Sequence, residues 1–433
     1  MTDFRTRSTL LSVTEFAAGL ISTYRKPPDT EILLATAAYV AKLPGLCCGE
    51  IDLALNVLLR ALGEEAGLSR FGSLVAHWDI KNRLANLCRF HERERRFPRV
   101  VEEPIVAPII ITGSPRSGTT FLQTLLAEIP ENDVPRCWEV VYPHLAPHES
   151  RWRDFRPLRM ERQLRYFKRL APDLHKVHPI SAWSPQECTE IQAHVFQSLR
   201  FSSTYNIPSY RKWLDDHGYR AAYGFHKRFL QHLQHQHGRQ QWILKSPDHV
   251  FALDAMLSTY PDARVVFVHR DPIKVLPSNA HLIEIIRAPF TTRIDRWEIG
   301  RQLTADLASG AANMIEAART GRIPSSRLFH LYFSDLVSRP LDSILRLYRH
   351  FGLSITASAA ERISRRIAVQ PTGGYARNAY RFERHNINPD EVEARFRDYV
   401  TYFDVPREPI GPTLSRTSKF APISTTHAEY LPR

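Results

Sequence analysis

The chain has 433 residues, 43% of them hydrophobic and 24% charged, values that are ordinary for a globular enzyme with a large core. Its formal net charge of +13 favours anionic ligands. The basic residues are mixed with acidic ones, as in His91-Glu92-Arg93-Glu94-Arg95-Arg96, which is typical of a solvated helix face. We therefore expect no nucleic-acid partner.

The cysteines are odd in number and include no C-x-x-C pair; they are Cys47, Cys48, Cys88, Cys137 and Cys188. This pattern argues against a disulfide framework and a zinc site, and it favours a cytoplasmic location. The N-terminus lacks the apolar core of a secretion signal, and no run of about 18 apolar residues is present to span a membrane. Peripheral contact with a membrane stays open.

The first part of the chain, from residue 8 to about residue 97, has apolar residues at helical spacings. The pattern is broken at Pro44-Gly45 and between Gly67 and Gly72. We predict a helical N-terminal subdomain over residues 1–103, with helical segments at Ile32–Val40, Ile51–Leu62 and Leu74–Phe97.

The rest of the chain alternates apolar strands with helical segments, which predicts an α/β fold with a mostly parallel central sheet flanked by helices. This second domain should cover residues 104–405, with a helical insertion at about 136–238. Residues 406–433 lack periodicity and are predicted to be an extended or disordered tail. The predicted strands are Val106–Thr112, Gln241–Lys245, Arg264–His269 and Arg327–Phe333.

The first predicted strand ends in a turn and is followed at once by a helix, an arrangement that binds anions through the free N–H groups and the positive dipole end of the helix. Gly113 and Gly118 have the spacing of a nucleotide-binding P-loop, but Thr119 stands where that loop has its Lys. Arg116 supplies the positive charge instead, with a planar fork that matches a tetrahedral oxyanion. We predict a P-loop-like phosphate site made of Gly113, Ser114, Pro115, Arg116, Ser117, Gly118, Thr119 and Thr120. The alternative is a strand-turn-helix junction with an incidental Arg.

A second cluster of polar residues follows the strand Arg264–His269. Ligands of open α/β sheets lie at the carboxyl ends of the strands, so Arg270 and Ser278 are candidates to hold a further phosphate. The alternative is an ion pair between Arg270 and Asp271 next to a helix-capping Ser.

These two motifs resemble those of the sulfotransferases that use 3′-phosphoadenosine 5′-phosphosulfate (PAPS). The loop is similar to their 5′-phosphosulfate loop, and R-D-P-x-x-x-x-x-S resembles their 3′-phosphate motif. Further blocks resemble a bacterial group of this superfamily, with the similarity running from about Gly67 to Phe403: Trp138-Glu139, Ser184-Pro185-Gln186-Glu187-Cys188, Leu244-Lys245-Ser246-Pro247 and Phe251-Ala252-Leu253-Asp254-Ala255.

The resemblance implies transfer of a sulfonate group to a hydroxyl, which leaves adenosine 3′,5′-bisphosphate (PAP). Such transfer needs a general base for the hydroxyl proton and a cation or proton donor for the departing phosphate oxygen. It needs no metal, because fixed Arg, Lys and backbone dipoles take that role. We expect Arg116 and Lys245 to be catalytic cations, Lys245 acting on the leaving group as in the protein-tyrosine sulfotransferases. Lys245 could instead pair with Asp248.

The leading candidate for the general base is Glu139, because related sulfotransferases have a Glu at about this place. A structural pairing of Glu139 with Arg136 or Arg116 is the alternative. His178, Glu187 and His249 remain as further candidates for the base.

Two further features of the sequence carry expectations of their own. Arg377, in Gly373-Gly374-Tyr375-Ala376-Arg377, is a candidate to reach the 3′-phosphate, as a basic segment does in related enzymes. The histidines His226, His232, His235 and His237 invite a metal interpretation, but their spacings do not place three ligands on one helical face. We expect no metal.

The acceptor is the least constrained part of the prediction. We expect the helical insertion to wall its pocket, and aromatic residues between Phe196 and Tyr210 favour a small-molecule or lipid alcohol or a phenol. The sequence indicates no oligomeric state. It leaves open a P-loop kinase or nucleotidase with a degenerate loop, and a non-catalytic nucleotide-binding protein.

Overall fold

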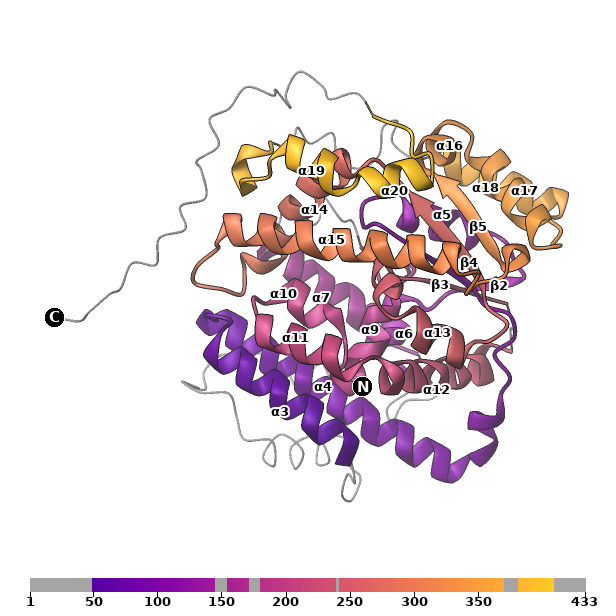
Figure 1. Cartoon of the computed structure of the whole chain (residues 1–433). Coiled ribbons are helices and arrows are strands. Elements are labelled where there is room, and N and C mark those ends of the chain that lie inside the picture. Colours follow the sequence, from indigo (N-terminus) through magenta and orange to yellow (C-terminus); the bar gives the residue numbers. More distant parts are fainter. Residues whose placement is uncertain (1–48, 145–153, 171–179, 239–240, 370–380, 409–433) are drawn as a thin grey trace.

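The computed structural model describes residues 49–144, 154–170, 180–238, 241–369 and 381–408 (Figure 1). His178, Arg377 and the tail beyond residue 408 lie outside the described residues. None of the described helices is long and apolar enough to cross a membrane.

The centre of the molecule is a five-stranded sheet in which every neighbouring pair is parallel, with the order β2-β3-β1-β4-β5. The predicted α/β fold with a parallel sheet is confirmed. The strands are β1 (Ile109–Gly113), β2 (Asn132–Asp133), β3 (Gln241–Lys245), β4 (Arg264–His269) and β5 (Leu328–Tyr332).

The strand boundaries follow from local backbone geometry. β3 and β4 have the predicted bounds, whereas β1 begins at Ile109 instead of Val106. Ala107 has a positive φ of 41°, and its N–H donates to the Asp262 carboxylate, so the chain is still turning there. The two-residue strand β2 was not predicted, because a strand this short leaves no alternating pattern.

The sheet separates two apolar clusters because successive side chains of a strand point to opposite faces. Ile109 and Ile111 of β1 belong to one cluster, together with α5 (Thr119–Leu126), α17 (Pro340–His350) and α18 (Ala357–Ala368). Ile110 belongs to the other, larger cluster. The carboxyl ends of all five strands therefore meet at one edge, between two layers of helices.

The larger cluster joins the N-terminal helices to the rest of the molecule. Helices α3 (Gly49–Glu64) and α4 (Arg70–Arg96) confirm the two predicted helical segments that the structure describes. Their residues Leu58 and Leu84 are fully buried in the same cluster as Ile110 of the central strand. In Figure 1, α3 and α4 lie alongside the helices of the insertion. The predicted boundary at residue 103 stays a prediction, because the described part of residues 1–103 has no separate core.

In the described residues between 136 and 238, the named elements are all helical and are joined by loops. The elements of this insertion are α6 (Cys137–Val141), α7 (Arg156–Leu170), α9 (Cys188–Gln192), η3 (Ala193–Val195), α10 (Leu199–Thr204), α11 (Pro208–His217) and α12 (Arg220–His237).

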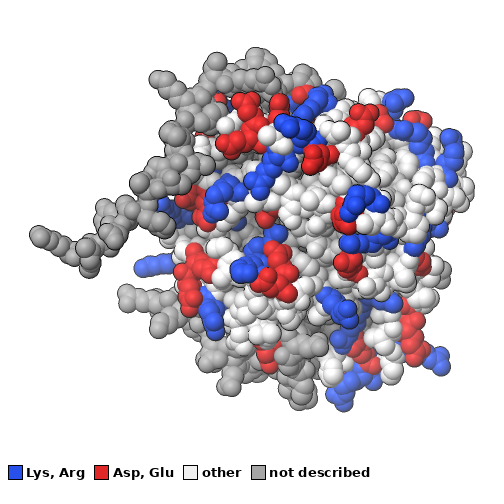
Figure 2. All heavy atoms as spheres, in the orientation of Figure 1, with Lys and Arg blue, Asp and Glu red and all other residues white. Residues whose placement is uncertain are grey.

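The remaining helical elements lie before and after the insertion in the sequence. On the face shown in Figure 2, acidic and basic side chains are interspersed, in agreement with the mixed charge pattern of the sequence. These elements are η1 (Pro98–Glu102), η4 (Pro247–Phe251), α13 (Leu253–Thr259), α14 (Pro272–Arg287), α15 (Arg296–Arg319), η5 (Ser325–Arg327), α16 (Phe333–Ser338), η6 (Glu383–His385), α19 (Pro389–Arg395) and α20 (Arg397–Tyr402).

Candidate active site

The loop between β1 and α5 depends on two glycines with positive φ. Gly113 has φ 132°, and a Cβ there would lie 2.3 Å from the carbonyl oxygen of Val268 on β4. Gly118 has φ 90° and is the N-cap residue of α5. Between them, Arg116 itself adopts φ 62°, and the Ser117 hydroxyl donates to the carbonyl of Ser114 at 2.6 Å. The loop thus wraps around the N-terminus of α5, where backbone N–H groups are available to an anion.

The two predicted phosphate motifs meet in space. Arg116 Nε donates to the hydroxyl of Ser278 on α14 at 3.1 Å, across 162 residues of sequence. Arg270, which directly follows β4, donates from Nη1 to the backbone carbonyl of Arg116 at 2.6 Å. The loop, Arg270 and Ser278 therefore form one contiguous cluster at the carboxyl edge of the sheet.

Arg270 already holds a carboxylate in this structure. Its Nε and Nη2 donate to the two carboxylate oxygens of Glu408 at 2.8 and 3.0 Å, and its guanidinium lies 3.7 Å from the centre of the Phe333 ring. The predicted alternative partner, Asp271, caps α14 instead and accepts from the backbone N–H of Glu408. A guanidinium that binds a carboxylate in this two-point way has the geometry that also matches a phosphate.

Lys245 lies at the end of β3, next to the loop. Its side chain is 1% exposed, and Nζ donates to the Thr120 hydroxyl at 3.1 Å and to Glu187 Oε1 at 2.5 Å. The expected alternative was an ion pair with Asp248, but the carboxylate in contact with Lys245 is that of Glu187. Lys245 and Glu187 thus form an ion pair that touches the first turn of α5.

Asp248 is the second carboxyl near this pair. Burial and the negative charge of Glu187 raise the pKa of Asp248 to about 7, against the opposing effect of Arg211. The two carboxyls therefore interact, and Asp248 is only partly ionised near neutral pH. No pattern in the sequence signals this shift.

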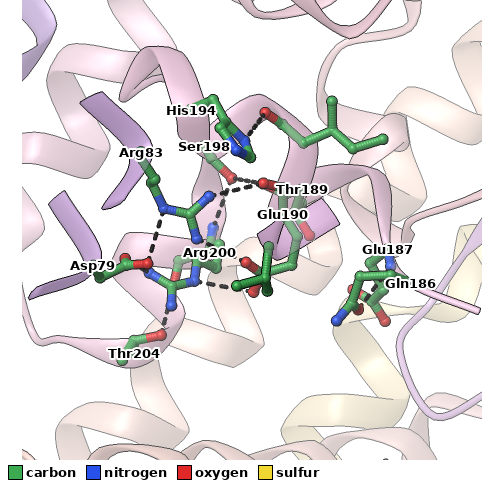
Figure 3. Close-up of polar contacts among 12 residues, drawn as sticks. Asp79, Arg83, Gln186, Glu187, Thr189, Glu190, His194, Ser198, Arg200 and Thr204 are labelled. Carbon is green, nitrogen blue, oxygen red and sulfur yellow. Dashed lines mark hydrogen bonds and ion pairs between the residues drawn. The ribbon is translucent and has the colours of Figure 1, made fainter. Parts of the chain in front are cut away.

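Glu187 is the N-cap residue of α9, and its side chain is 30% exposed. Its backbone N–H donates to the side-chain oxygen of Gln186 at 2.8 Å. Helix α9 has only five residues, so its position depends on contacts with its neighbours. Those contacts come from a cluster of charged residues on the far side of the helix (Figure 3).

That cluster, called here the positioning network, consists of Asp79 and Arg83 on α4, Glu190 on α9 and Arg200 on α10. Arg83 donates to Asp79 at 3.0 Å and to the carboxylate of Glu190 at 2.8 Å. Arg200 donates to the same two residues at 2.5 and 3.0 Å. Arg83 also donates to the backbone carbonyl of Glu190 at 2.9 Å. Two cations and two anions are therefore paired in a closed arrangement (Figure 3).

The network stays ionised at neutral pH. Burial alone raises the pKa of a carboxyl, but Arg200 and Arg83 together hold the pKa values of Asp79 and Glu190 below their ordinary range. Ionised partners fix the geometry of both ends of each contact. The N-terminal helix α4 thereby holds α9, and with it Glu187, in place.

Glu139 lies in a different, more buried environment. Its side chain is 2% exposed; Oε2 accepts from the backbone N–H of Arg136 at 2.9 Å, and Oε1 lies 3.0 Å from His237 Nε2. Burial lowers the pKa of His237, but its hydrogen bonds to Asp133 and Glu139 raise it to about 9 overall. Both oxygens of Glu139 are therefore engaged by structural partners, including the Arg136 that the sequence offered as an alternative.

His249 is fully buried on η4. Its Nδ1 lies 2.5 Å from the hydroxyl of Tyr223 on α12, and burial holds its pKa well below the ordinary value. The ring is thus neutral at physiological pH. Of the other candidate bases, Glu187 contacts Lys245, and His178 lies outside the described residues.

The histidines of α12 each face a different partner. His226 contacts Tyr260, His232 contacts Glu94 and His144, His235 contacts Glu103, and His237 contacts Asp133 and Glu139. Among the described residues no three His, Cys, Asp or Glu side chains are grouped to hold a metal ion. This run of histidines serves to anchor α12.

Two components of this region were not found from the sequence. Glu408 lies in the segment predicted to be a featureless tail, and the positioning network joins residues up to 121 positions apart. Within the network, only the four-residue spacing of Asp79 and Arg83 on a helix was a local signal.

The sequence of this chain is similar to that of one protein family and to two characterised proteins. The model of the family described as "Sulfotransferase family" matches residues 108–357, more than half of the chain. The curated relatives are the omega-hydroxy-beta-dihydromenaquinone-9 sulfotransferases Stf3 of Mycobacterium bovis and Mycobacterium tuberculosis, each 26% identical over 281 residues. The match covers 59% of this chain and 66% of each relative, so the chain spans just under two thirds of their length.

Two solved structures resemble most of this chain. The sulfotransferase STF9 from Mycobacterium avium has a TM-score of 0.79 and 25% identity, covering 89% of this chain and 98% of its own. The sulfotransferase STF1 from Mycobacterium tuberculosis H37Rv has a TM-score of 0.75 and 26% identity, covering 86% and 99%. The similarity therefore extends over most of the chain.

Proposed function

Since the chain belongs to the sulfotransferase family, we propose that it transfers the sulfonate group of PAPS to a hydroxyl group of an organic acceptor. The observation that carries the proposal is the convergence of the loop, Arg270, Ser278 and Lys245 at one edge of the sheet. Two separate cationic positions there match a donor with phosphate groups at both ends of its ribose.

The donor's 5′-phosphosulfate is assigned to the loop Gly113–Thr120 and its 3′-phosphate to Arg270 and Ser278. The two glycines let the loop pack closely against β4 and turn at the N-terminus of α5, where backbone N–H groups are available to an anion. Arg270 already binds a carboxylate through two points, which supports its role toward a phosphate. In this account the 3′-phosphate displaces Glu408 from Arg270.

In the proposed reaction, the acceptor oxygen attacks sulfur while the bond between sulfur and the 5′-phosphate oxygen breaks. PAP leaves, and the acceptor becomes a sulfate ester. Lys245 stabilises the negative charge that develops on the departing oxygen, and Arg116 neutralises the phosphate. Both cations are held by the fold, so they need little reorganisation during transfer.

A carboxylate takes the proton of the acceptor hydroxyl, and Glu187 fits this role better than Glu139. Glu187 is 30% exposed and contacts Lys245, whereas Glu139 is 2% exposed with both oxygens engaged. A base must come within hydrogen-bond distance of the proton it removes, so an accessible carboxylate is favoured. Glu139 remains the second candidate.

We infer an apolar alcohol as acceptor, a lipid hydroxyl above all. The names of the curated relatives describe a sulfotransferase of a hydroxylated menaquinone, which supports this class. The aromatic residues on which the sequence-based preference rested do not contribute, because Phe196, Phe201, Tyr205 and Tyr210 are all buried in the main core. Their abundance reflects packing of the insertion.

The proposal is tested by turnover with PAPS and a series of prenyl alcohols, fatty alcohols and phenols, without added metal. Formation of PAP together with a sulfate ester, both identified by mass spectrometry, is the expected result. Phosphoryl transfer from ATP with magnesium, and none from PAPS, would contradict it.

A further inference from the structure

Helix α7 exposes a continuous stripe of arginines and large apolar side chains. Apart from Lys168, the exposed residues recur at intervals of three, four, three, one and three, which places them on one face of the helix. They begin with Phe155 directly before the helix and continue into its last turn: Phe155, Leu158, Arg162, Arg165, Tyr166 and Arg169.

The apolar members of the stripe are not needed to attach the helix. Phe155 is 51% exposed, Leu158 46% and Tyr166 50%. The opposite face of α7 holds it in place, with Met160 in a small cluster with Trp138, and Phe167 stacked on Phe290 at 5.9 Å. A contiguous apolar surface that the fold does not use points to a binding partner.

The charge of α7 indicates what kind of partner this is. The helix carries six basic residues and one acidic residue, Glu161, whose carboxylate accepts from the backbone N–H of Ala182. Arg156, at its start, is buried and paired with Asp154. The remaining basic residues reach the surface or its edge, next to the exposed Phe, Leu and Tyr. Arginines interleaved with apolar and aromatic side chains match the boundary between lipid headgroups and acyl chains.

Helix α7 adjoins the candidate site through two tryptophans. The Arg156 guanidinium lies 4.6 Å from the ring centre of Trp138, and that ring contacts Trp183 at 5.8 Å. Trp183 is 58% exposed and stands four residues before Glu187. Exposed Trp is a typical side chain of membrane interfaces. Helix α7 thus packs, through its buried face, beside the segment that carries the carboxylate facing Lys245.

We propose that the exposed face of α7, together with Trp183, docks the protein on an anionic lipid membrane. The arginines contact phosphate-bearing headgroups, while Phe155, Leu158, Tyr166 and Trp183 enter the acyl boundary. The docking itself does not depend on sulfonate transfer. The advantage of docking rests on the proposed function, because a docked enzyme would receive a lipid alcohol directly from the membrane, without transfer through water.

The proposal is tested by cosedimentation of the full chain with phosphatidylcholine vesicles, with and without phosphatidylglycerol. The wild-type protein is expected to bind the vesicles that contain phosphatidylglycerol and to be released by salt. The double variant Arg162→Gln/Arg165→Gln should lose affinity by about fivefold for each arginine removed. The matched control is Arg362→Gln/Arg365→Gln, two exposed arginines with the same spacing on α18.

A second variant tests the apolar part of the stripe. Leu158→Ser/Tyr166→Ser keeps every charge of α7, and it should weaken binding to vesicles of the same composition while circular dichroism stays unchanged. Equal losses of vesicle affinity in the α7 and α18 arginine variants would overturn the proposal, since they would indicate an effect of the protein's net charge alone. Absence of wild-type binding, or binding of duplex RNA through α7 in place of vesicles, would also overturn it.

The same proteins report separately on the proposed function. Titration calorimetry with PAP should give the same affinity for wild type and for all three variants, because none of the changed residues belongs to the donor cluster. A protein that binds PAP but no vesicles disproves membrane docking alone. A protein that binds vesicles but not PAP disproves the donor assignment alone.

Discussion

Two clusters of charged residues lie on opposite sides of the short helix α9. One cluster holds the helix in position, and the other is suited to act on a substrate. The positioning network pairs two carboxylates with two guanidiniums in a closed arrangement (Figure 3). The Lys245–Glu187 pair instead joins one carboxylate to one cation, and that cation also touches the phosphate loop. A closed set of charges fixes geometry, while an open pair next to an anion site can act on a substrate.

A large effect on turnover is expected when Lys245 is replaced. Lys245→Met keeps an unbranched side chain of similar length but removes the cation, so kcat should fall about 10²–10³-fold through loss of charge stabilisation in the transition state. Initial rates of PAP release measure this. Lys212→Met, at an exposed Lys on α11, is the control and should keep the wild-type rate.

The second prediction separates the two candidate bases. Glu187→Gln should lower the kcat of the folded protein by about 10²–10⁴-fold, the usual contribution of a general base. Glu139→Gln should instead lower stability by about 1–3 kcal/mol through weakened buried hydrogen bonds. Turnover rates and melting curves of both variants decide which carboxylate is the general base. If Glu139→Gln abolishes turnover at unchanged stability while Glu187→Gln remains active, the assignment is reversed.

Breaking the positioning network should act mainly on stability. Arg83→Met leaves two buried carboxylates to share Arg200, and removal of one partner of a buried ion pair costs about 3–5 kcal/mol. Urea denaturation gives this value directly. Arg83→Lys, which keeps the charge, should recover part of the stability and part of the rate. A loss of activity with no loss of stability would contradict a supporting role.

The Glu139–His237 pair should make stability depend on pH. The pKa of folded His237 is raised to about 9, so its contribution is full below the unfolded value of about 6.5 and is lost as the pH rises through 9. Melting temperatures of wild type and His237→Gln should therefore differ most at pH 6 and converge towards pH 10. A constant difference over this range would refute the proposed protonation.

The smallest expected effect concerns Glu408. Glu408→Gln removes a charge that competes with the donor for Arg270, so the affinity for PAP should rise about two- to fivefold, the value of a partly exposed ion pair. Titration calorimetry is sensitive enough to detect it. Glu383→Gln, at an exposed Glu elsewhere in the C-terminal region, should have no effect.

The fold and the donor cluster were predictable because their signals are local. Runs of apolar residues with clear ends predicted the bounds of β3 and β4, and the glycines on either side of Arg116 indicated the loop. The parallel sheet then implied that residues after different strands meet at one edge, as Arg116 and Ser278 do.

The partners of the carboxylates were not predictable, because they depend on tertiary contacts. Nothing near Glu187 in the sequence indicates that Lys245, 58 residues away, is its partner. Glu139 follows a recognisable block, yet its environment is set by His237, about a hundred residues downstream. Likewise, the many aromatic residues between Phe196 and Tyr210 were compatible with either a buried core or the wall of a pocket, and the structure places them in the core.

The central claim is that Arg270 and the loop form one site for the two ends of PAPS. Titration calorimetry with PAP, without metal and against ATP with magnesium, tests it most directly. The account predicts micromolar binding of PAP that is lost in Arg270→Ala and little affinity for ATP with magnesium. Tight binding of ATP with magnesium, and none of PAP, would contradict the account.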